Sequence, residues 1–234
     1  MGVSTLSTEN PVSITNIFCL LGKPGAGRET ILKNIMHRPE FIESCNIHRL
    51  VYGTTRPKNP YDIEGETYYF LSKDEFMNLD PDEIIESRSY DPFFDQEYYY
   101  FTLTSHIHFG YNYIGKISTF QYEELKKWAI KMQLKIPMLR INLFPITINA
   151  PIFVREKRIM NKASTDEDVY KMCTKLISEK YEFNTVVKEN SEIIDSMNPQ
   201  SLIIDNSLTD KSNIVIICNK IENFIKKKII MQGI

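Results

Sequence analysis

Glycines at positions 22, 25 and 27 mark a stretch of the chain that could bind phosphate. The stretch reads Gly22-Lys-Pro-Gly-Ala-Gly-Arg-Glu-Thr30. Glycines allow positive φ angles and a close approach of the backbone, so that N–H groups can point inward at a phosphate group. A helix that begins at the end of the stretch would add the positive end of its dipole. We therefore predict phosphate binding by Gly22, Gly25, Ala26, Gly27, Arg28, Glu29 and Thr30.

The two residues after the last glycine change the chemistry of this loop. Phosphate-binding loops commonly continue with lysine and then serine or threonine, whereas this chain has Arg28 and Glu29. Arginine keeps the positive charge but carries it on a planar fork instead of a compact ammonium. Glu29 stands where a hydroxyl commonly ligates magnesium, and its carboxylate repels a triphosphate unless it holds the metal or points away. A plain tight turn between a strand and a helix is the alternative interpretation.

The residues on either side of the loop predict the elements that must position it. Residues Ile14–Leu21 are almost continuously apolar, which is typical of a strand buried on both faces of a parallel sheet. Apolar residues at helical spacing follow from Arg28 to Met36. A strand, a glycine loop and a helix in this order form the context that a phosphate-binding loop requires.

Strand and helix patterns continue to alternate along the chain and predict an α/β fold. We expect a mainly parallel sheet flanked by helices, with a tyrosine-rich inserted lobe. Ser72 with Glu75 and Ser164 with Glu167 indicate capping boxes, the second opening a helix that runs to about residue 188. Further strands are expected at 48–52, 66–71, 84–104, 111–119, 137–148 (interrupted by Pro145) and 201–205, and further helices at 121–131, 151–162 and 213–230.

A second motif, from Thr54 to Phe70, is more specific than the glycine loop. It reads Thr54-Thr-Arg-Pro-Lys-Asn-Pro-Tyr-Asp-Ile-Glu-Gly-Glu-Thr-Tyr-Tyr-Phe70. It resembles the monophosphate-binding loop of guanylate kinases, which runs Thr-Thr-Arg-x-x-Arg-x-x-Glu-x-x-Gly-x-x-Tyr-x-Phe. The chain departs from this pattern at Asn59, where the family has arginine, and at Asp62, where it has glutamate. The matching positions are Thr54, Thr55, Arg56, Gly65, Tyr68 and Phe70.

Weaker matches to the same family continue toward the end of the chain. Ile85-Glu86 resembles a Phe-x-Glu segment whose carboxylate reads the guanine edge, and Tyr99-Tyr-Phe-Thr102 resembles Tyr-Tyr-Gly-Ser/Thr. Arg158-Ile-Met-Asn-Lys162 is similar to the Arg-Leu-x-x-Arg sequence that enters the lid, and Ile203-Ile-Asp-Asn206 resembles the last strand and its asparagine. The Asp-x-Asp of the family is absent, because the corresponding stretch reads Ile114-Gly-Lys-Ile-Ser118.

The resemblance implies an ATP-dependent kinase for a nucleoside monophosphate, first GMP or dGMP, on the P-loop NTPase fold. Mg²⁺ would accompany ATP. A flexible tail (residues 1–12) would precede a guanylate kinase-like domain (13–234), whose monophosphate-binding lobe (about 53–104) and helical lid (about 155–190) would close over both substrates. The resemblance assigns monophosphate binding to Arg56, Asp62, Tyr68, Glu86, Tyr100 and Thr102, and catalysis to Arg28, Arg158 and Lys162.

The chemistry of a guanine nucleotide explains these assignments. A carboxylate such as Glu86 accepts hydrogen bonds from N1–H and N2–H₂, and a hydroxyl such as Thr102 can contact O6 or N7. Arg56, with Tyr68 and Tyr100, could clamp the monophosphate, because arginine grips phosphate through two hydrogen bonds. The alternative interpretations are a surface carboxylate for Glu86 and ordinary strand packing for the tyrosines.

The composition favours an ordinary soluble protein without a nucleic-acid or membrane partner. The formal net charge of −2 provides no global basic field. The four cysteines form no C-x-x-C pair and imply neither zinc nor disulfides. His106 and His108 lie on one side of an expected strand without a third ligand nearby, so we expect a polar face and no metal site. We expect a cytoplasmic location, because the N-terminus lacks a signal-peptide pattern; the oligomeric state stays open.

Two other functions stay open at this point. The departures at Arg28, Glu29 and Asn59 favour a binding module that keeps the fold and lacks catalysis, as in scaffold proteins whose monophosphate lobe holds phosphorylated peptides. Asn59 and Asp62 also alter the contacts to the base and the phosphate. A kinase for another nucleoside monophosphate is therefore the third possibility.

Overall fold

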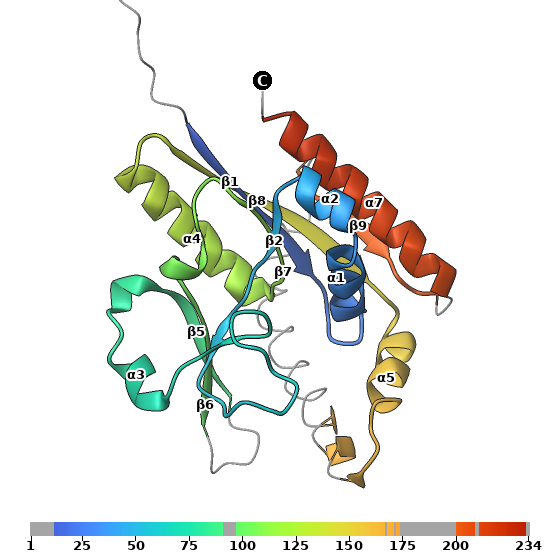
Figure 1. The fold of residues 1–234 in the computed structure, drawn as a ribbon. Coiled ribbons are helices and arrows are strands. Elements are labelled where there is room, and N and C mark those ends of the chain that lie inside the picture. Colours follow the sequence, from blue (N-terminus) through green and yellow to red (C-terminus); the bar gives the residue numbers. More distant parts are fainter. Residues whose placement is uncertain are drawn as a thin grey trace, which may run out of the picture.

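The computed structural model describes residues 12–90, 97–166, 168–170, 172–173, 200–208 and 211–232. Within these residues the chain forms a larger sheet of five strands and a smaller sheet of four strands, with helices around the larger one (Figure 1). The larger sheet is parallel and the smaller one is mixed. The expected α/β architecture with a small mixed β lobe is therefore confirmed.

The larger sheet places the end of its central strand at the glycine loop. Its strand order is β2-β7-β1-β8-β9, so that β1 lies in the middle and runs directly into the loop. The carboxyl ends of parallel strands gather at one edge of the sheet, which is where ligands bind in open α/β folds. The strands are β1 (Ser13–Leu21), β2 (Ile47–Arg49), β7 (Asn112–Lys116), β8 (Leu139–Asn149) and β9 (Leu202–Asp205).

Side chains of β1 alternate between two cores, one on each face of the sheet. Phe18 and Leu20 pack with α1 and α7, whereas Ile17 and Cys19 pack with α4. This alternation explains why β1 is apolar at nearly every position. None of the described helices is both long and apolar enough to cross a bilayer. The helices around the sheet are α1 (Arg28–Met36), α2 (Pro39–Ser44), α4 (Thr119–Lys135), α5 (Ile152–Met160) and α7 (Lys211–Ile230).

The expected strand interruption at Pro145 is wrong. β8 runs without a break and pairs with β1 from Leu139 to Thr147, with Pro145 opposite Cys19. Its pairing with β9 begins only at Ile146. Proline is tolerated in a strand where no ladder hydrogen bond depends on its missing N–H.

The smaller sheet carries the motif that follows Gly53. Its strand order is β4-β3-β6-β5, and its core contains Phe76, Phe101 and Leu103. The Ser72–Glu75 capping box is confirmed at the start of α3 (Lys73–Met77). The strands are β3 (Gly53–Thr54), β4 (Tyr69–Phe70), β5 (Ile84–Tyr90) and β6 (Tyr98–Leu103).

Two expectations next to this sheet need correction. His106 does not lie on a strand, because it is the last residue of a short 3₁₀ helix (Thr104–His106). Another 3₁₀ helix, Pro81–Glu83, precedes β5. The imidazole of His106 stacks on Tyr69, with ring centroids 4.4 Å apart. It is therefore a packed ring and not part of an exposed polar face.

The expected lid is described only at its beginning. α5 ends at Met160, so Lys162 lies in the turn beyond it and not on the helix. The next cap is one residue later than expected, because Asp168 donates its backbone N–H to the Thr165 hydroxyl and accepts from the backbone N–H of Thr165 and Ser164. Glu167, the lid beyond residue 173 and the expected tail at residues 1–11 lie outside the described residues.

Candidate functional site

The glycine loop turns so tightly that it requires its glycines. Gly25 has a φ of 75°, in the region that other residues rarely adopt. A Cβ atom there would lie 2.5 Å from the backbone oxygen of Arg155. Gly27 has a φ of 99° and is the N-cap residue of α1. The loop therefore leads into the N-terminus of a helix, which is the geometry that binds phosphate.

Side chains from α5 and from the end of β9 hold the loop in place. Asn206 is buried and donates from Nδ2 to the carbonyl oxygen of Ala26 at 2.7 Å. Arg155, which is also buried, donates to the Pro24 carbonyl at 3.1 Å. Arg158 donates from Nη1 to the Gly25 carbonyl at 3.4 Å and from Nη2 to the Asn206 carbonyl at 2.9 Å. These contacts make the loop a preformed element.

The expected catalytic cations take different places around the loop. Arg158 lies against the loop backbone, and its burial lowers the pKa of its guanidinium. Arg28 donates from Nη1 to the carbonyl oxygen of Ile117 at 3.0 Å, beside the end of β7. Lys162 is exposed in the turn after α5, and Thr30 is exposed on α1. The structure thus brings Arg28 and Arg158 to the loop but not Lys162.

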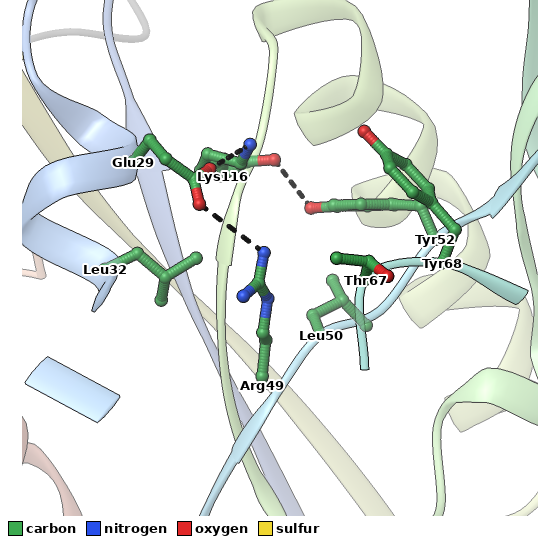
Figure 2. A pocket seen from close by; sticks show the side chains of 8 residues that line it. All are labelled: Glu29, Leu32, Arg49, Leu50, Tyr52, Thr67, Tyr68 and Lys116. Atoms are coloured by element: carbon green, nitrogen blue, oxygen red, sulfur yellow. Dashed lines mark hydrogen bonds and ion pairs between the residues drawn. The ribbon is translucent and has the colours of Figure 1, made fainter. Parts of the chain in front are cut away.

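Glu29 lies at the centre of a cluster of cations (Figure 2). Its carboxylate contacts the ammonium of Lys116, and it lies 3.7 Å from Nη2 of Arg49 and 3.9 Å from Nζ of Lys33. Burial raises the pKa of the Glu29 carboxyl, but the hydrogen bond and charge of Lys116, with the charges of Arg49 and Lys33, outweigh burial and hold the pKa below its usual value. Glu29 is therefore ionised at neutral pH.

Three members of this cluster, Glu29, Arg49 and Lys116, line a pocket of about 110 Å³ between the large sheet and the small lobe. Glu29 comes from α1, whereas Thr67 and Tyr68 come from the small-lobe motif (Figure 2). The pocket thus joins the glycine loop to the second motif, as a site for two phosphorylated groups requires. Its lining residues are Glu29, Leu32, Arg49, Leu50, Tyr52, Thr67, Tyr68 and Lys116.

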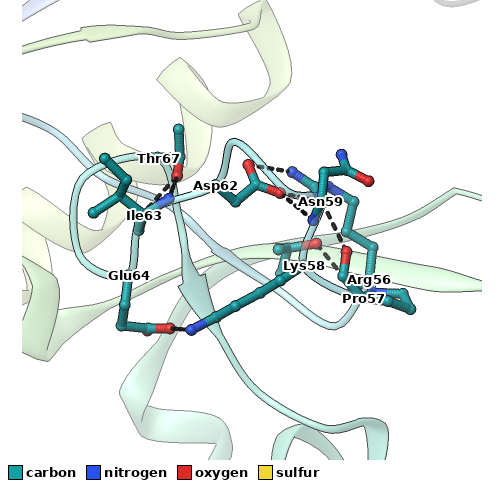
Figure 3. A network of polar contacts seen from close by, with 9 residues as sticks. Arg56, Pro57, Lys58, Asn59, Asp62, Ile63, Glu64 and Thr67 are labelled. Atoms are coloured by element: carbon teal, nitrogen blue, oxygen red, sulfur yellow. Dashed lines mark hydrogen bonds and ion pairs between the residues drawn. The ribbon is translucent and has the colours of Figure 1, made fainter.

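The small-lobe motif is folded on itself through a bidentate ion pair (Figure 3). Arg56 donates to both carboxylate oxygens of Asp62, at 2.7 and 3.0 Å, and this lowers the pKa of the Asp62 carboxyl. Asp62 also accepts from the backbone N–H of Asn59 at 2.7 Å. Asp62 and Arg56 were both expected to contact the monophosphate. In the structure they bind each other.

The three residues that were expected to clamp the phosphate lie next to one another. The Arg56 guanidinium lies over the ring of Tyr68, 5.0 Å from its centroid. Tyr68 in turn meets Tyr100 edge to face, with ring centroids 5.9 Å apart. Burial raises the pKa of the Tyr68 hydroxyl, which stays protonated and can donate a hydrogen bond.

Glu86 is buried, with 4% of its surface exposed, so its interpretation as a surface carboxylate is wrong. Its Oε1 accepts from the Thr102 hydroxyl at 2.7 Å and from Nε2 of Gln121 at 2.9 Å. Within the described part of the chain, its Oε2 is buried without a hydrogen bond, although Nε of Arg88 lies 3.8 Å away. A buried acceptor without a donor costs free energy, and a ligand that supplies N–H groups would remove that cost.

The residues at the loop do not fit a protein-ligated magnesium ion. P-loop proteins hold Mg²⁺ with a loop hydroxyl and an aspartate at a strand end. Here the first position is Glu29, whose carboxylate is paired with Lys116 at the end of β7. The described residues also contain no group of three His, Cys, Asp or Glu side chains that could hold a metal.

The polar residues of the site that sequence reasoning missed include Arg49, Lys116, Gln121 and Arg155. Lys116 had a signal, because it lies in the stretch where the family's aspartates are absent, while an extra acid appears at Glu29. When an acid such as Glu29 and a base such as Lys116 both replace the usual residues, the two replacements together indicate an ion pair. The other three residues come from separate elements and match no motif.

Comparisons with known proteins find a family model and several relatives. A family model described as Guanylate kinase matches residues 15–198. A guanylate kinase from Nostoc sp. is 38% identical over 72 residues, which cover 30% of this chain and 33% of that protein. A guanylate kinase from Thermotoga maritima is 34% identical over 64 residues, which cover 26% and 27%.

The likeness to these relatives is partial. The chain spans about a third of the length of the curated relatives it matches. A solved guanylate kinase from Anaplasma phagocytophilum is 18% identical with a TM-score of 0.49, over 92% of this chain and 87% of that one.

Proposed function

The chain belongs to the guanylate kinase family, and from that premise we propose that it transfers a phosphoryl group from ATP to a nucleoside monophosphate, GMP or dGMP. The observation that carries this proposal is the buried carboxylate of Glu86, whose Oε2 lacks a hydrogen bond among the described residues. Guanine offers two adjacent donors on one edge, N1–H and N2–H₂, whereas adenine offers an acceptor at N1. A buried acceptor therefore favours guanine.

The neighbours of Glu86 support a base site and not only a structural one. Thr102 and Gln121 both donate to Oε1 and fix the direction of the carboxylate. Oε2 then has the charge of Arg88 3.8 Å away but no hydrogen bond among the described residues, so it could accept one from a ligand. Preorganisation of this kind makes recognition specific, because a base without the matching donors leaves the buried oxygen unpaired.

The transfer itself needs alignment and positive charge more than covalent chemistry. An oxygen of the monophosphate attacks the γ-phosphorus of ATP, the bond from that phosphorus to the bridging oxygen breaks, and ADP leaves. Arg56, Tyr68 and Tyr100 would hold the acceptor phosphate, while Arg28 and Arg158, the two expected cations that lie at the loop, would stabilise the charge on the transferred group. In this proposal Mg²⁺ reaches the site only as the ion bound to the phosphates of ATP.

A coupled assay of ADP formation tests the proposal. Purified protein is incubated with ATP, Mg²⁺ and each of GMP, dGMP, AMP, CMP and UMP in turn. We expect turnover with the two guanine nucleotides. Folding is checked by circular dichroism in the same buffer. If the folded protein shows no turnover with any of these monophosphates, the kinase proposal is wrong.

A second candidate function is a nucleotide-binding module without catalysis. It is favoured by the placement of Arg28, whose guanidinium donates to the Ile117 carbonyl. A catalytic cation that is held by a backbone carbonyl must give up that hydrogen bond before it can reach the donor phosphates. Under this alternative the small lobe binds its ligand and the glycine loop is structural.

The substitution Arg28→Lys separates the two candidates. Lysine lacks the fork that donates to Ile117 and presents a single ammonium to the β- and γ-phosphates. If the chain is a kinase with an altered loop, we expect turnover to rise. If GMP raises the melting temperature but ATP does not, and Arg28→Lys has no turnover, the module is the correct function.

A further inference from the structure

We propose that the ammonium of Lys116, held by Glu29, takes the electrostatic place of the protein-ligated magnesium ion, so that the chain binds the triphosphate of ATP independently of metal. This inference rests on the proposed function, because it concerns the ATP site of the glycine loop. It follows from the mismatch between the residues of the loop and the usual ligands of Mg²⁺.

Strand pairing places Lys116 beside the glycine loop. β7 runs parallel to β1, and Lys116 is the partner of Leu20, close to where β1 enters the loop. Lys116 is the last residue of β7, at the carboxyl edge of the sheet. Glu29 lies in the first turn of α1, directly after the loop. The pair thus occupies the two places, loop helix and strand end, from which P-loop proteins hold their metal.

The charges of the cluster match what a metal site would provide. On the wall of the pocket, the carboxylate of Glu29 with the cations of Lys116 and Arg49 leaves one net positive charge, whereas Lys33, 3.9 Å from Glu29, lies outside the pocket lining. A hydroxyl, an aspartate and a divalent cation leave the same net charge. A magnesium ion bound to Glu29 would have to displace the ammonium of Lys116 or stay beside it, where the two cations repel each other.

The cluster is both fixed and accessible. The Tyr52 hydroxyl donates to the Lys116 carbonyl at 2.6 Å and holds the backbone of this residue. The side chains of Lys116 and Arg49 are 32% and 28% exposed, on the wall of the pocket that joins the loop to the small lobe. A bound phosphate could therefore contact both cations without a change in the fold.

Calorimetric titration with the non-hydrolysable ATP analogue AMP-PNP tests the inference. It is done on the full chain, once in EDTA and once in excess Mg²⁺. We expect the wild-type Kd in EDTA to lie within about threefold of the Kd in Mg²⁺, because the chain supplies its own cation. The double variant Glu29→Ser/Lys116→Asp rebuilds a hydroxyl and an aspartate, and we expect its binding in EDTA to be at least about tenfold weaker than in Mg²⁺.

A matched double variant controls for the loss of an ion pair as such. Glu123 and Lys126 form an ion pair on α4 with a 2.7 Å contact, and neither residue lines the pocket. Glu123→Ser/Lys126→Asp carries the same two substitutions. We expect it to bind AMP-PNP as the wild type does, in both buffers.

The outcomes separate this inference from the proposed function. If wild-type binding requires Mg²⁺, or if the double variant at the loop stays independent of metal, the inference is wrong and the kinase proposal stands. If the wild type binds GMP but not AMP-PNP in either buffer, both are wrong. If the loop variant does not fold, Lys116→Met takes its place, and undiminished AMP-PNP binding in EDTA overturns the inference.

Discussion

Two carboxylates of the site, Glu29 and Glu86, differ in the groups that they contact. Glu29 is surrounded by cations and is saturated by them. Glu86 accepts two hydrogen bonds from neutral side chains on one oxygen, and within the described residues its other oxygen has none. The first carboxylate is therefore neutralised by its neighbours, whereas the second has an oxygen that could accept hydrogen bonds from a ligand.

The substitution Glu86→Gln tests the base contact. The amide keeps an acceptor for Thr102 and Gln121 but presents N–H groups to the donor edge of guanine. We expect GMP binding to weaken by about 1.5–3 kcal/mol, which is about ten- to hundredfold in Kd. Isothermal titration with GMP measures the change.

The control for this substitution is Glu83→Gln, which alters an exposed carboxylate in the preceding 3₁₀ helix. It should leave the Kd for GMP unchanged. A folded Glu86→Gln protein that binds GMP as tightly as the wild type would show that this carboxylate does not read the base.

At the scale of elements, the glycine loop depends on parts of the chain that lie far away in sequence. Asn206 follows β9, and Arg155 and Arg158 belong to α5, yet all three donate to the loop region. The smaller sheet depends more on local contacts, such as the capping box of α3. Damage to either element should therefore affect one ligand more than the other.

The substitution Asn206→Ala removes the hydrogen bond to the Ala26 carbonyl and leaves that oxygen unpaired. Asn206 is buried, so we expect the free energy of unfolding to fall by about 1–3 kcal/mol. ATP binding should weaken more than GMP binding, because the loop lies on the donor side. Urea denaturation and two titrations measure these effects.

Asn213→Ala is the matched control for Asn206→Ala. Asn213 donates to Oδ1 of Asn206 at 3.3 Å, and its loss leaves the bond to Ala26 in place. We expect a smaller loss of stability and no selective effect on ATP. Equal effects of the two substitutions would contradict a specific role of Asn206 in holding the loop.

The substitution Ser72→Ala tests the capping box at the start of α3, next to the smaller sheet. Ser72 accepts from the backbone N–H of Glu75 and caps α3. We expect a loss of about 1 kcal/mol in the free energy of unfolding, measured by urea denaturation. The control is Ser87→Ala, at an exposed position of β5. If both substitutions lower the free energy of unfolding equally, Ser72 has no specific role as a helix cap.

At the scale of the whole molecule, one half-buried imidazole links stability to pH. His106 packs against Tyr69 and accepts a hydrogen bond from the backbone N–H of Leu103. Burial lowers the pKa of His106 from 6.5 to about 4. The folded protein thus keeps this ring neutral in a pH range where the unfolded chain protonates it.

Between pH 6.5 and about 4 the unfolded state binds one more proton at His106, so the free energy of unfolding falls as the pH falls. We expect this residue to account for a loss of about 2 kcal/mol between pH 7 and pH 5. Urea denaturation of His106→Gln at both pH values should show a correspondingly flatter dependence. His48→Gln, which alters an exposed histidine, should keep the wild-type slope, and an unchanged slope for His106→Gln would contradict the assignment.

Local patterns in the sequence determined the parts of this protein that are made from contiguous residues. β1, the glycine loop and α1 follow from an apolar run, a set of glycines and a helical spacing that adjoin one another. The α3 capping box is equally local. The Thr54–Phe70 motif identified the family because its residues form one continuous pattern, and the family model agrees.

Contacts between separate elements were decided only by the tertiary structure. The alignment of Glu29 with Lys116 and Arg49 depends on how α1, β7 and β2 meet at one edge of the sheet. Pro145 became part of a continuous strand because β8 pairs with β1 on both sides of this residue, from Leu139 to Thr147. A sequence specifies which side chains a segment carries. Charge pairing and burial depend on neighbours that packing brings from other parts of the chain. The proposed role of Lys116 in place of a metal ion therefore rests on the tertiary structure.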